Sequence, residues 1–321
     1  MEFKITKLDK PATITSVITT VMLAAFSVFF IIKVPYGLLF AAGMMSIVFF
    51  SYLLAPGRYF FEGAKLVIEK NTGKRIVIPV QDIEGYIFVP DFLKLKPIRA
   101  FGNGGLFGYY GIFSTREYGN INCQLTGLKN IFLIKTKKGF FAISPLETTR
   151  FDEYLRSTII GITGKVEAVE PIEPGKIKHA SPFILLVPDA VFTLTLIMLI
   201  LVYPRLPEHV ATHFNFHGKA DGWSSKSSFV VMGLVPAAIL LALNIVVFFI
   251  VRRRTHDPRT ANFVVLLFSL IQLFTSYISL DIYWFSIYNH HIIAIHYASL
   301  AFLGMFLLVI WGYYDKIRKT T

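Results

Sequence analysis

Three of the eight histidines in the chain recur at an interval of four residues. His209, His213 and His217 are followed at the same interval by Asp221. On a helix this spacing would place the four side chains along one face. Neutral imidazoles together with a carboxylate suit zinc. One interpretation is therefore a zinc site, and a pH-sensitive histidine cluster is another.

The same segment also favours turns. Asn215 and Asp221 are residue types that bond nearby backbone in turns, and Gly218 allows a positive φ. They argue against a continuous helix, and the metalloprotease pattern His-Glu-x-x-His is not present. We therefore favour a compact loop over residues 203–228 with no resident cofactor. The metal alternative is zinc at His209, His213 and His217. The loop residues expected to bind a partner are His213, Asn215, His217, Gly218, Asp221 and Trp223.

Polar residues also interrupt three long apolar runs, and they are Asp189, Asn244 and Gln272. An ionisable group inside a membrane span is a functional hypothesis by default. Asp189 and Asn244 lie at the same predicted depth, about 10 Å from one end of their spans. We predict that they hydrogen bond, or share a hydrated cavity with Gln272. The alternative is a bond that only fixes helix packing. Asp281, near the end of its run, is expected to reach water or to join the histidines predicted on the same outer side, which beyond the loop are His290, His291 and His296.

The elements that position these residues follow from composition. Apolar residues make up 54% of the chain and charged residues only 16%. A soluble protein of this length needs more charge to cover its surface, and about 20 apolar residues suffice to span a bilayer. We predict an α-helical polytopic membrane protein with about six transmembrane helices. The apolar runs are residues 12–32, 38–56, 182–202, 229–251, 263–285 and 292–314.

The net charge of +12 has a simple explanation in such a protein. Basic clusters occur at residues 4–10, 252–259 and 316–319. Lys and Arg favour the cytoplasmic side, and six spans place all three clusters there. We predict a plasma-membrane location with cytoplasmic termini and an outward loop at 203–228. No nucleic-acid motif accompanies the charge, so no nucleic-acid partner is expected.

Between the second and third spans the pattern changes to alternation, as in residues 64–69 and 75–78, with turn residues between them. Further strands are predicted at 83–89, 130–136 and 140–143, and a helix from near Glu147. About seven strands and a terminal helix predict a small cytoplasmic β-barrel. The predicted domains are a two-helix anchor (1–57), this β-domain (58–178) and a four-helix membrane domain (179–321).

The β-domain is rich in basic residues. A function in binding anionic lipid headgroups and a simple solvated face are equally compatible with this composition. The residues concerned are Lys94, Lys96, Arg99, Lys135, Lys137 and Lys138. The glycine-rich run at 102–111 lacks the Gly-Lys-Ser/Thr end of a P-loop, so phosphate cradling is disfavoured. Cys123 is the single cysteine, which excludes a disulfide framework.

Two resemblances add to this. The run Gly104-Gly105-Leu106-Phe107-Gly108-Tyr109-Tyr110-Gly111, followed later by Ser144-Pro145 and a helix, resembles a bacterial pleckstrin-homology-type domain. The segment with Leu206-Pro207, His213-Phe214-Asn215, Gly218 and Asp221-Gly222-Trp223 resembles the signature loop of a second family. That family is a membrane domain of unknown function shared with immunity and signalling proteins for the sporulation-delaying toxin. Ala211 departs from it, since the family often has Pro there.

The second resemblance implies a membrane architecture and a link to peptide sensing or resistance, and no catalysed reaction. We predict a non-enzymatic regulatory, sensing or immunity protein whose partners are membrane lipids and a peptide or protein. The alternative is a transporter or resistance protein for a small amphiphile, although inverted repeats are not evident. A metal-dependent membrane hydrolase ranks last, because no nucleophile lies beside a base in a recognised arrangement.

Overall fold

A computed structural model describes the chain except for residues 34–36, 173–178, 216, 256 and 319–321. Its contacts divide the chain into two compact units. The first unit is essentially residues 1–177, with the short segments 254–256 and 318–321. The second unit covers 178–253 and 257–317. The predicted anchor and β-domain therefore lie in one unit.

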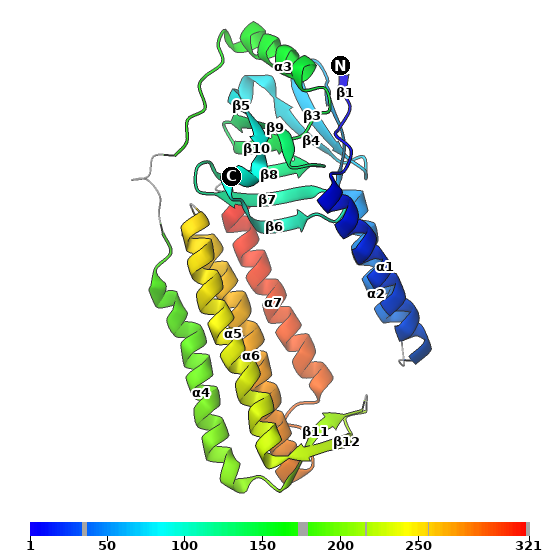
Figure 1. Cartoon of the computed structure of the whole chain (residues 1–321), viewed down its shortest axis with the longest axis vertical. Coiled ribbons are helices and arrows are strands. Elements are labelled where there is room, and N and C mark those ends of the chain that lie inside the picture. Colours follow the sequence, from blue (N-terminus) through cyan, green and yellow to red (C-terminus); the bar gives the residue numbers. More distant parts are fainter. Residues whose placement is uncertain (34–36, 173–178, 216, 256, 319–321) are drawn as a thin grey trace. The chain divides into compact units, whose positions relative to one another are not determined.

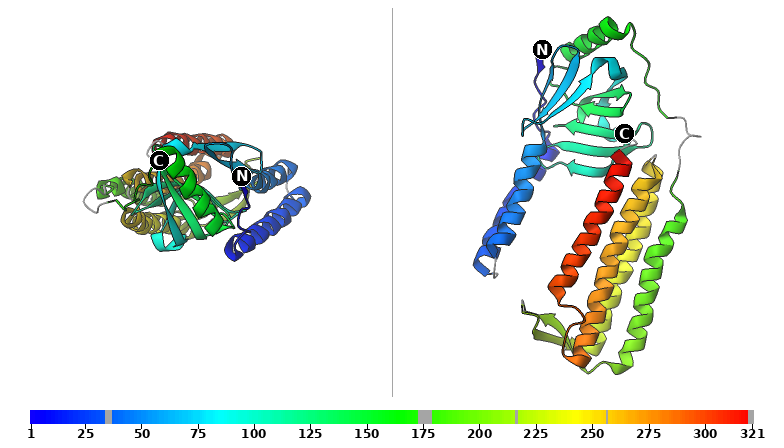
Figure 2. Two further views of the ribbon diagram at one scale, coloured as in Figure 1. Left: turned by 90° about the horizontal axis from the view of Figure 1, so that it is seen from above. Right: turned by 180° about the vertical axis from the view of Figure 1, so that it is seen from behind.

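Among the described residues, six helices are long and apolar enough to cross a membrane, as predicted. Two belong to the first unit, where they lie side by side: α1 (Lys10–Lys33) and α2 (Gly37–Leu54) (Figures 1 and 2). The second predicted span continues to Pro56, but α2 ends at Leu54 and Pro56 begins a strand. The corner at 34–36 lies outside the described residues.

In the described part of this unit, ten strands form two sheets, against about seven strands predicted. The first sheet is antiparallel, in the order β1 (Glu2–Phe3), β2 (Pro56–Phe61), β3 (Lys65–Lys70), β4 (Arg75–Pro79). The second is ordered β5-β9-β10-β8-β7-β6, and β8 and β10 pair in parallel. Its strands are β5 (Ile83–Asp91), β6 (Ile98–Gly104), β7 (Tyr109–Thr115), β8 (Gly119–Leu125), β9 (Lys129–Thr136) and β10 (Gly139–Ile143).

Both sheets share one core with helix α3 (Thr148–Thr163), which begins next to Glu147 as predicted. Phe3 from β1, Phe132 from β9 and Phe151 from α3 are almost fully buried and in ring contact. Each such side chain contributes about 1.5–3 kcal/mol by leaving water. Cys123 is fully buried, and burial raises the pKa of its thiol well above the ordinary value. The thiol is therefore unreactive in the folded domain.

Asp9 joins α1 to the β-domain. Its Oδ1 accepts hydrogen bonds from the backbone N–H of Ala12, at 2.9 Å, and from the Tyr109 hydroxyl, at 3.1 Å. Its Oδ2 accepts from the backbone N–H of Leu128, at 3.1 Å. The first bond satisfies a free donor at the helix N-terminus, and the other two hold the start of β7 and the loop before β9 against it. Burial, and then the Asp9 charge, raise the pKa of Tyr109.

The glycine-aromatic run joins β6 to β7 and contacts both α1 and α2. The backbone N–H of Phe107 donates to the Ser16 hydroxyl in α1, at 2.8 Å. The Tyr110 hydroxyl donates to the Ser51 carbonyl in α2, at 2.6 Å. Gly108 has φ +128°, and a Cβ there would lie 2.7 Å from the Leu125 carbonyl oxygen. Glycine is thus required where the loop turns toward the helices.

The second unit contains four helices that lie side by side (Figure 1). They are α4 (Leu186–Val202), α5 (Lys226–Arg254), α6 (Pro258–Tyr288) and α7 (Ile295–Arg318). A hydroxyl pair, Thr195 with Ser276 at 2.6 Å, joins α4 to α6. Gly233 allows α5 to approach α6 closely, because a Cβ there would lie 3.1 Å from the Ser279 hydroxyl. Between α4 and α5 the chain forms a β-hairpin.

Candidate functional site

The predicted loop folds as two antiparallel strands, β11 (His209–Phe214) and β12 (Ala220–Ser225). Irregular pairing around His213 marks bulges in the ladder. At the tip, the Asn215 side-chain oxygen accepts from the backbone N–H groups of His217, at 2.9 Å, and Lys219, at 3.1 Å. Gly218 has φ +75°, a conformation that favours glycine. The turn roles predicted for Asn215 and Gly218 are confirmed.

The histidines do not stack along a helix. His209 and His213 lie on a strand, His217 lies in the turn, and Asp221 lies on the opposite strand. Within the described part of the chain, no three His, Cys, Asp or Glu side chains gather as ligands would. Residues four apart lie on one face only in a helix, and the turn residues in this segment favour a hairpin instead.

Asp221 instead contacts His213 across the hairpin, through the Nδ1 atom. The His213 side chain is 74% exposed and that of Asp221 is 43% exposed, so water screens this pair strongly. Trp223, also on β12, is 60% exposed. All three side chains are exposed, and we refer to them together as the accessible face of the hairpin. Large exposed aromatic groups of this kind are typical of contact surfaces for partners.

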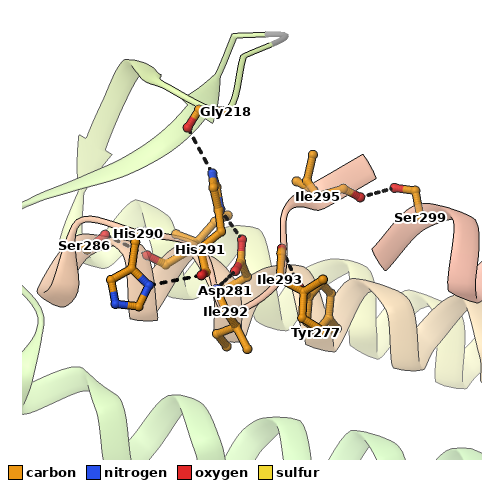
Figure 3. Close-up of polar contacts among 11 residues, drawn as sticks. Gly218, Tyr277, Asp281, Ser286, His290, His291, Ile292, Ile293, Ile295 and Ser299 are labelled. Carbon is orange, nitrogen blue, oxygen red and sulfur yellow. Dashed lines mark hydrogen bonds and ion pairs between the residues drawn. The ribbon is translucent and has the colours of Figure 1, made fainter. Parts of the chain in front are cut away.

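A second histidine–carboxylate pair lies beneath the hairpin, and it is buried. Asp281 in α6 has a side chain only 2% exposed, and that of His291, in the α6–α7 connection, is 12% exposed. Asp281 Oδ2 lies 2.6 Å from His291 Nδ1, and its Oδ1 accepts from the Ile292 N–H at 2.8 Å. His291 Nε2 lies 3.0 Å from the Gly218 carbonyl oxygen at the hairpin tip (Figure 3). This chain of contacts is the clamp: Asp281, His291 and Gly218.

The partners of His291 fix how many protons the clamp holds. Its Nε2 faces a carbonyl oxygen, which only accepts, so Nε2 must donate. Its Nδ1 faces the Asp281 carboxyl, and one further proton is needed between these two atoms for a hydrogen bond. That proton makes either an imidazolium with a carboxylate or a neutral pair, and the count is the same. Losing it leaves two acceptors facing each other.

Aromatic rings enclose the clamp. The ring of Phe214, from β11, and that of Phe285, from α6, each lie 4.8 Å from the His291 ring, centroid to centroid. Phe214 and Phe285 also contact each other in an edge-on arrangement at 4.8 Å. Shielding from water strengthens the polar contacts of the clamp. The expectation that Asp281 reaches water is wrong, and the expectation that it joins a histidine is confirmed.

The predicted bond between Asp189 and Asn244 does not form. Asn244 is fully buried, and its Nδ2 donates to the Val265 carbonyl, at 3.2 Å, and the Ser269 hydroxyl, at 3.4 Å, both in α6. Asp189 is exposed near the start of α4. Gln272 is fully buried in α6, and its amide atoms have no hydrogen-bond partner among the described residues. Equal depth therefore did not bring these groups together.

Replacing Asn244 with leucine is expected to change the free energy of unfolding by no more than about 1 kcal/mol, because hydrogen bonds between membrane helices average about 0.6 kcal/mol. The substitution also removes a buried Oδ1 atom that has no hydrogen-bond partner among the described residues. The measurement is thermal unfolding of the purified protein in detergent. A loss above about 3 kcal/mol would contradict a packing role and indicate that the amide holds a buried polar ligand.

Six membrane-length helices, a two-sheet domain with a terminal helix and a clamped hairpin define a polytopic membrane protein with one β-rich domain. Residues 57–159 match the family model described as "Bacterial PH domain", and residues 190–238 match "Domain of unknown function (DUF1648)". The pleckstrin-homology-type resemblance is thus confirmed. The second match covers β11 and β12.

A protein of Clostridium acetobutylicum described as uncharacterized is 24% identical to the chain over 179 residues. The similarity covers 55% of this chain and 58% of that protein, less than two thirds of its length. No solved structure gives a significant match.

Proposed function

We propose that the chain is a non-enzymatic regulatory membrane protein, with the hairpin as the recognition element and the β-domain as a binding module. The clamp carries this proposal. It connects the tip of an accessible hairpin, at Gly218, to a buried carboxylate in α6. A partner that displaces the hairpin would break the contact of His291 with Gly218. Such a loss alters the end of α6 and the start of α7, which is how a local contact biases helix positions.

The proposal includes an orientation. Basic residues lie at the start of α1, at the end of α5 and in the last turns of α7. Because Lys and Arg favour the cytoplasmic side of a membrane, we propose that both termini and the β-domain lie in the cytoplasm. The hairpin faces outward from the cell membrane, where it meets peptides or proteins. The DUF1648 match supports the likeness of this loop to the toxin-immunity family, and peptide immunity is the form of recognition we propose.

No catalytic step is part of this function. Both nitrogens of His291 and both oxygens of Asp281 already contact protein groups, so the pair has no free position for a substrate. The exposed pair of His213 and Asp221 has no adjacent nucleophile among the contacts of the described residues. Its place on the accessible face fits contact with a partner.

The test is survival of host cells exposed to membrane-active toxic peptides. Deleting the gene is expected to lower survival, and the wild-type gene is expected to restore it. His291→Ala should fail to restore it, because the hairpin is no longer clamped. His209→Ala is the matched control, since His209 is exposed and outside the clamp. Equal survival without the gene would refute immunity, and full rescue by His291→Ala would refute sensing through the clamp.

A second candidate, resistance to or transport of a small amphiphile, rests on a different observation. Asp189 lines a groove of about 360 Å³ whose other walls are apolar residues of α4, α5 and the turn before α4. A carboxylate beside apolar walls suits a cation with an apolar tail. Asp189→Asn should then abolish resistance to cationic amphiphiles while leaving peptide survival unchanged. The reverse pattern would favour the hairpin.

A further inference from the structure

Loops of the β-domain close around the ends of α1 and α2. The last carbonyls of α2 accept from the β3–β4 turn: Asn71 Nδ2 donates to Tyr52 at 3.0 Å, and the Thr72 N–H donates to Leu53 at 3.0 Å. At the start of α1, Asp9 accepts from Leu128, whose carbonyl in turn accepts from the Phe92 N–H at 2.8 Å. We name residues 7–10, 70–74, 91–99 and 126–129 the collar.

The collar adjoins the ends of the two candidate membrane spans of this unit. The first span begins at Lys10 and the second ends at Leu54. Segments 70–74 and 126–129 are each one hydrogen bond from these helix ends, and segment 91–99 is one bond further. The ends of a helix that spans the bilayer lie near the lipid headgroups, so we expect the collar to lie close to that layer.

Cations on the collar outnumber its acidic groups and lack ion-pair partners among the described residues. Its basic side chains are Lys7, Lys10, Lys70, Lys74, Lys94, Lys96, Arg99 and Lys129. The acidic residues on the same segments, Asp9 and Asp91, accept hydrogen bonds from backbone N–H groups. Burial, and then the neighbouring charge of Lys74, lower the pKa of Lys70, as expected for cations crowded without a counter-ion.

Several basic residues away from the collar have ion-pair partners. Lys135 pairs with Glu84 at 2.9 Å, and Lys137 lies 3.7 Å from Asp82. Arg58 and Arg75 both bind Glu69. The six basic residues noted in the sequence therefore differ. Lys94, Lys96 and Arg99 lie on the collar without ion pairs among the described residues, whereas Lys135 and Lys137 lie off the collar and pair within the domain. Lys138 also lies off the collar and has no ion pair among the described residues.

The collar also presents one apolar tip. Leu93 is 58% exposed, between Phe92, which is buried, and Lys94, which is exposed. The Asp91 side chain holds this turn by accepting from the Leu93 N–H at 2.9 Å. Lys96 ends the turn in the left-handed region, with φ 48°. An apolar side chain flanked by lysines is typical of segments that enter the boundary between headgroups and acyl chains.

We propose that the collar binds anionic phospholipid headgroups of the membrane leaflet in which α1 begins and α2 ends. The lysines and Arg99 pair with lipid phosphates, and Leu93 enters the acyl boundary. This takes the proposed binding role of the β-domain one step further and rests on it. Its readout is lipid rather than cell survival, so a failure of hairpin sensing and a failure of lipid binding are distinguishable.

The test uses the purified full chain in a non-ionic detergent, with phosphatidylglycerol or phosphatidylcholine added and bound lipid counted by native mass spectrometry. The wild type is expected to bind phosphatidylglycerol at least about tenfold more tightly. The triple variant K94Q/K96Q/R99Q should lose most of this preference. The triple variant K135Q/K137Q/K138Q removes the same charge and should keep it. No preference in the wild type, or equal loss in both variants, would overturn the proposal.

Two further arms identify the source of the phosphate and the depth of Leu93. Inorganic phosphate at millimolar concentration should not displace the lipid, and displacement would indicate a site for a soluble phosphate. Leu93→Cys carrying a nitroxide should be more accessible to oxygen than to a water-soluble nickel chelate in bilayers. Ile160→Cys on α3 is the control in water, and buried Cys123 does not compete for label. A water-exposed label at residue 93 would overturn the proposal.

Discussion

Replacing Asp281 with alanine is expected to release the hairpin from α6 and speed amide hydrogen exchange in residues 209–225 about 100-fold. The substitution removes the acceptor for His291 Nδ1 and for the Ile292 N–H. Breaking a buried pair by removing one partner costs about 3–5 kcal/mol. We use the lower limit of this range. A decrease of about 3 kcal/mol in the free energy of opening corresponds to an increase of about 100-fold in the exchange rate.

The exposed pair provides the matched control. Asp221→Ala removes the carboxylate beside His213, where both side chains are in water. Exposed pairs contribute less than about 1 kcal/mol, so exchange should change less than about fivefold. Equal acceleration in both variants would mean that the buried pair does not hold the hairpin. The double variant with His291→Ala should add little to Asp281→Ala, since both substitutions remove one interaction.

Asp9→Ala is expected to have the second large effect, this time on the β-domain. The substitution removes the cap of α1, worth about 1 kcal/mol. It also leaves the Tyr109 hydroxyl and the Leu128 N–H without their acceptor, at about 1–3 kcal/mol for buried groups. A total of about 3 kcal/mol should make the thiol of Cys123 react about 100-fold faster with a maleimide. Labelling of this single, buried cysteine reports opening of the domain.

Asp91→Ala is the comparison for that experiment. Asp91 also accepts a backbone bond at the start of a turn, from Leu93, but it has no second loop to hold. Labelling of Cys123 should then accelerate less than about fivefold. If the two variants behave alike, Asp9 serves only as a cap and the loops are held by other contacts. The clearest such contact is the bond from the Phe107 N–H to Ser16.

The sequence predicts well what depends on local pattern. Each span is a continuous apolar run, so length and hydropathy locate it without knowledge of its neighbours. The strands at 83–89 and 140–143 and the helix after Glu147 follow from alternation and turn residues in the same way. By contrast, β1 has only two residues and no period to detect. It forms because Phe3 enters a core made by residues far along the chain.

The contact of the clamp with the hairpin tip is not predicted, for a related reason. The interval between His209, His213 and His217 predicts contacts among neighbours in the sequence. The partner of Gly218 at the hairpin tip is instead His291, which lies 73 residues after Gly218. Asn289 is in the left-handed region with φ 54° and ends α6, so the chain reverses and returns His291 to Asp281. An acidic residue one or two turns before the end of a span, followed by a histidine-containing connection, was the available signal.

Depth alone likewise does not give the direction of a side chain. Asp189 and Asn244 were matched by their distance from the ends of their spans. A helix turns by about 100° per residue, so two groups at one level can face different neighbours. Asn244 faces α6, where Val265 and Ser269 accept its bonds. Asp189 lies on an exposed side of α4.

The pairing of β1 with β2 has a consequence for biosynthesis. Residues 2–3 emerge from the ribosome before both helices of the first unit, and their partners at 59–60 emerge after them. The sheet is completed only if both segments reach the same side of the membrane. The chain must therefore cross the bilayer in α1 and return in α2 before the domain folds. An insertion error that stranded one segment across the membrane would expose the edge of β2 and leave the core without Phe3.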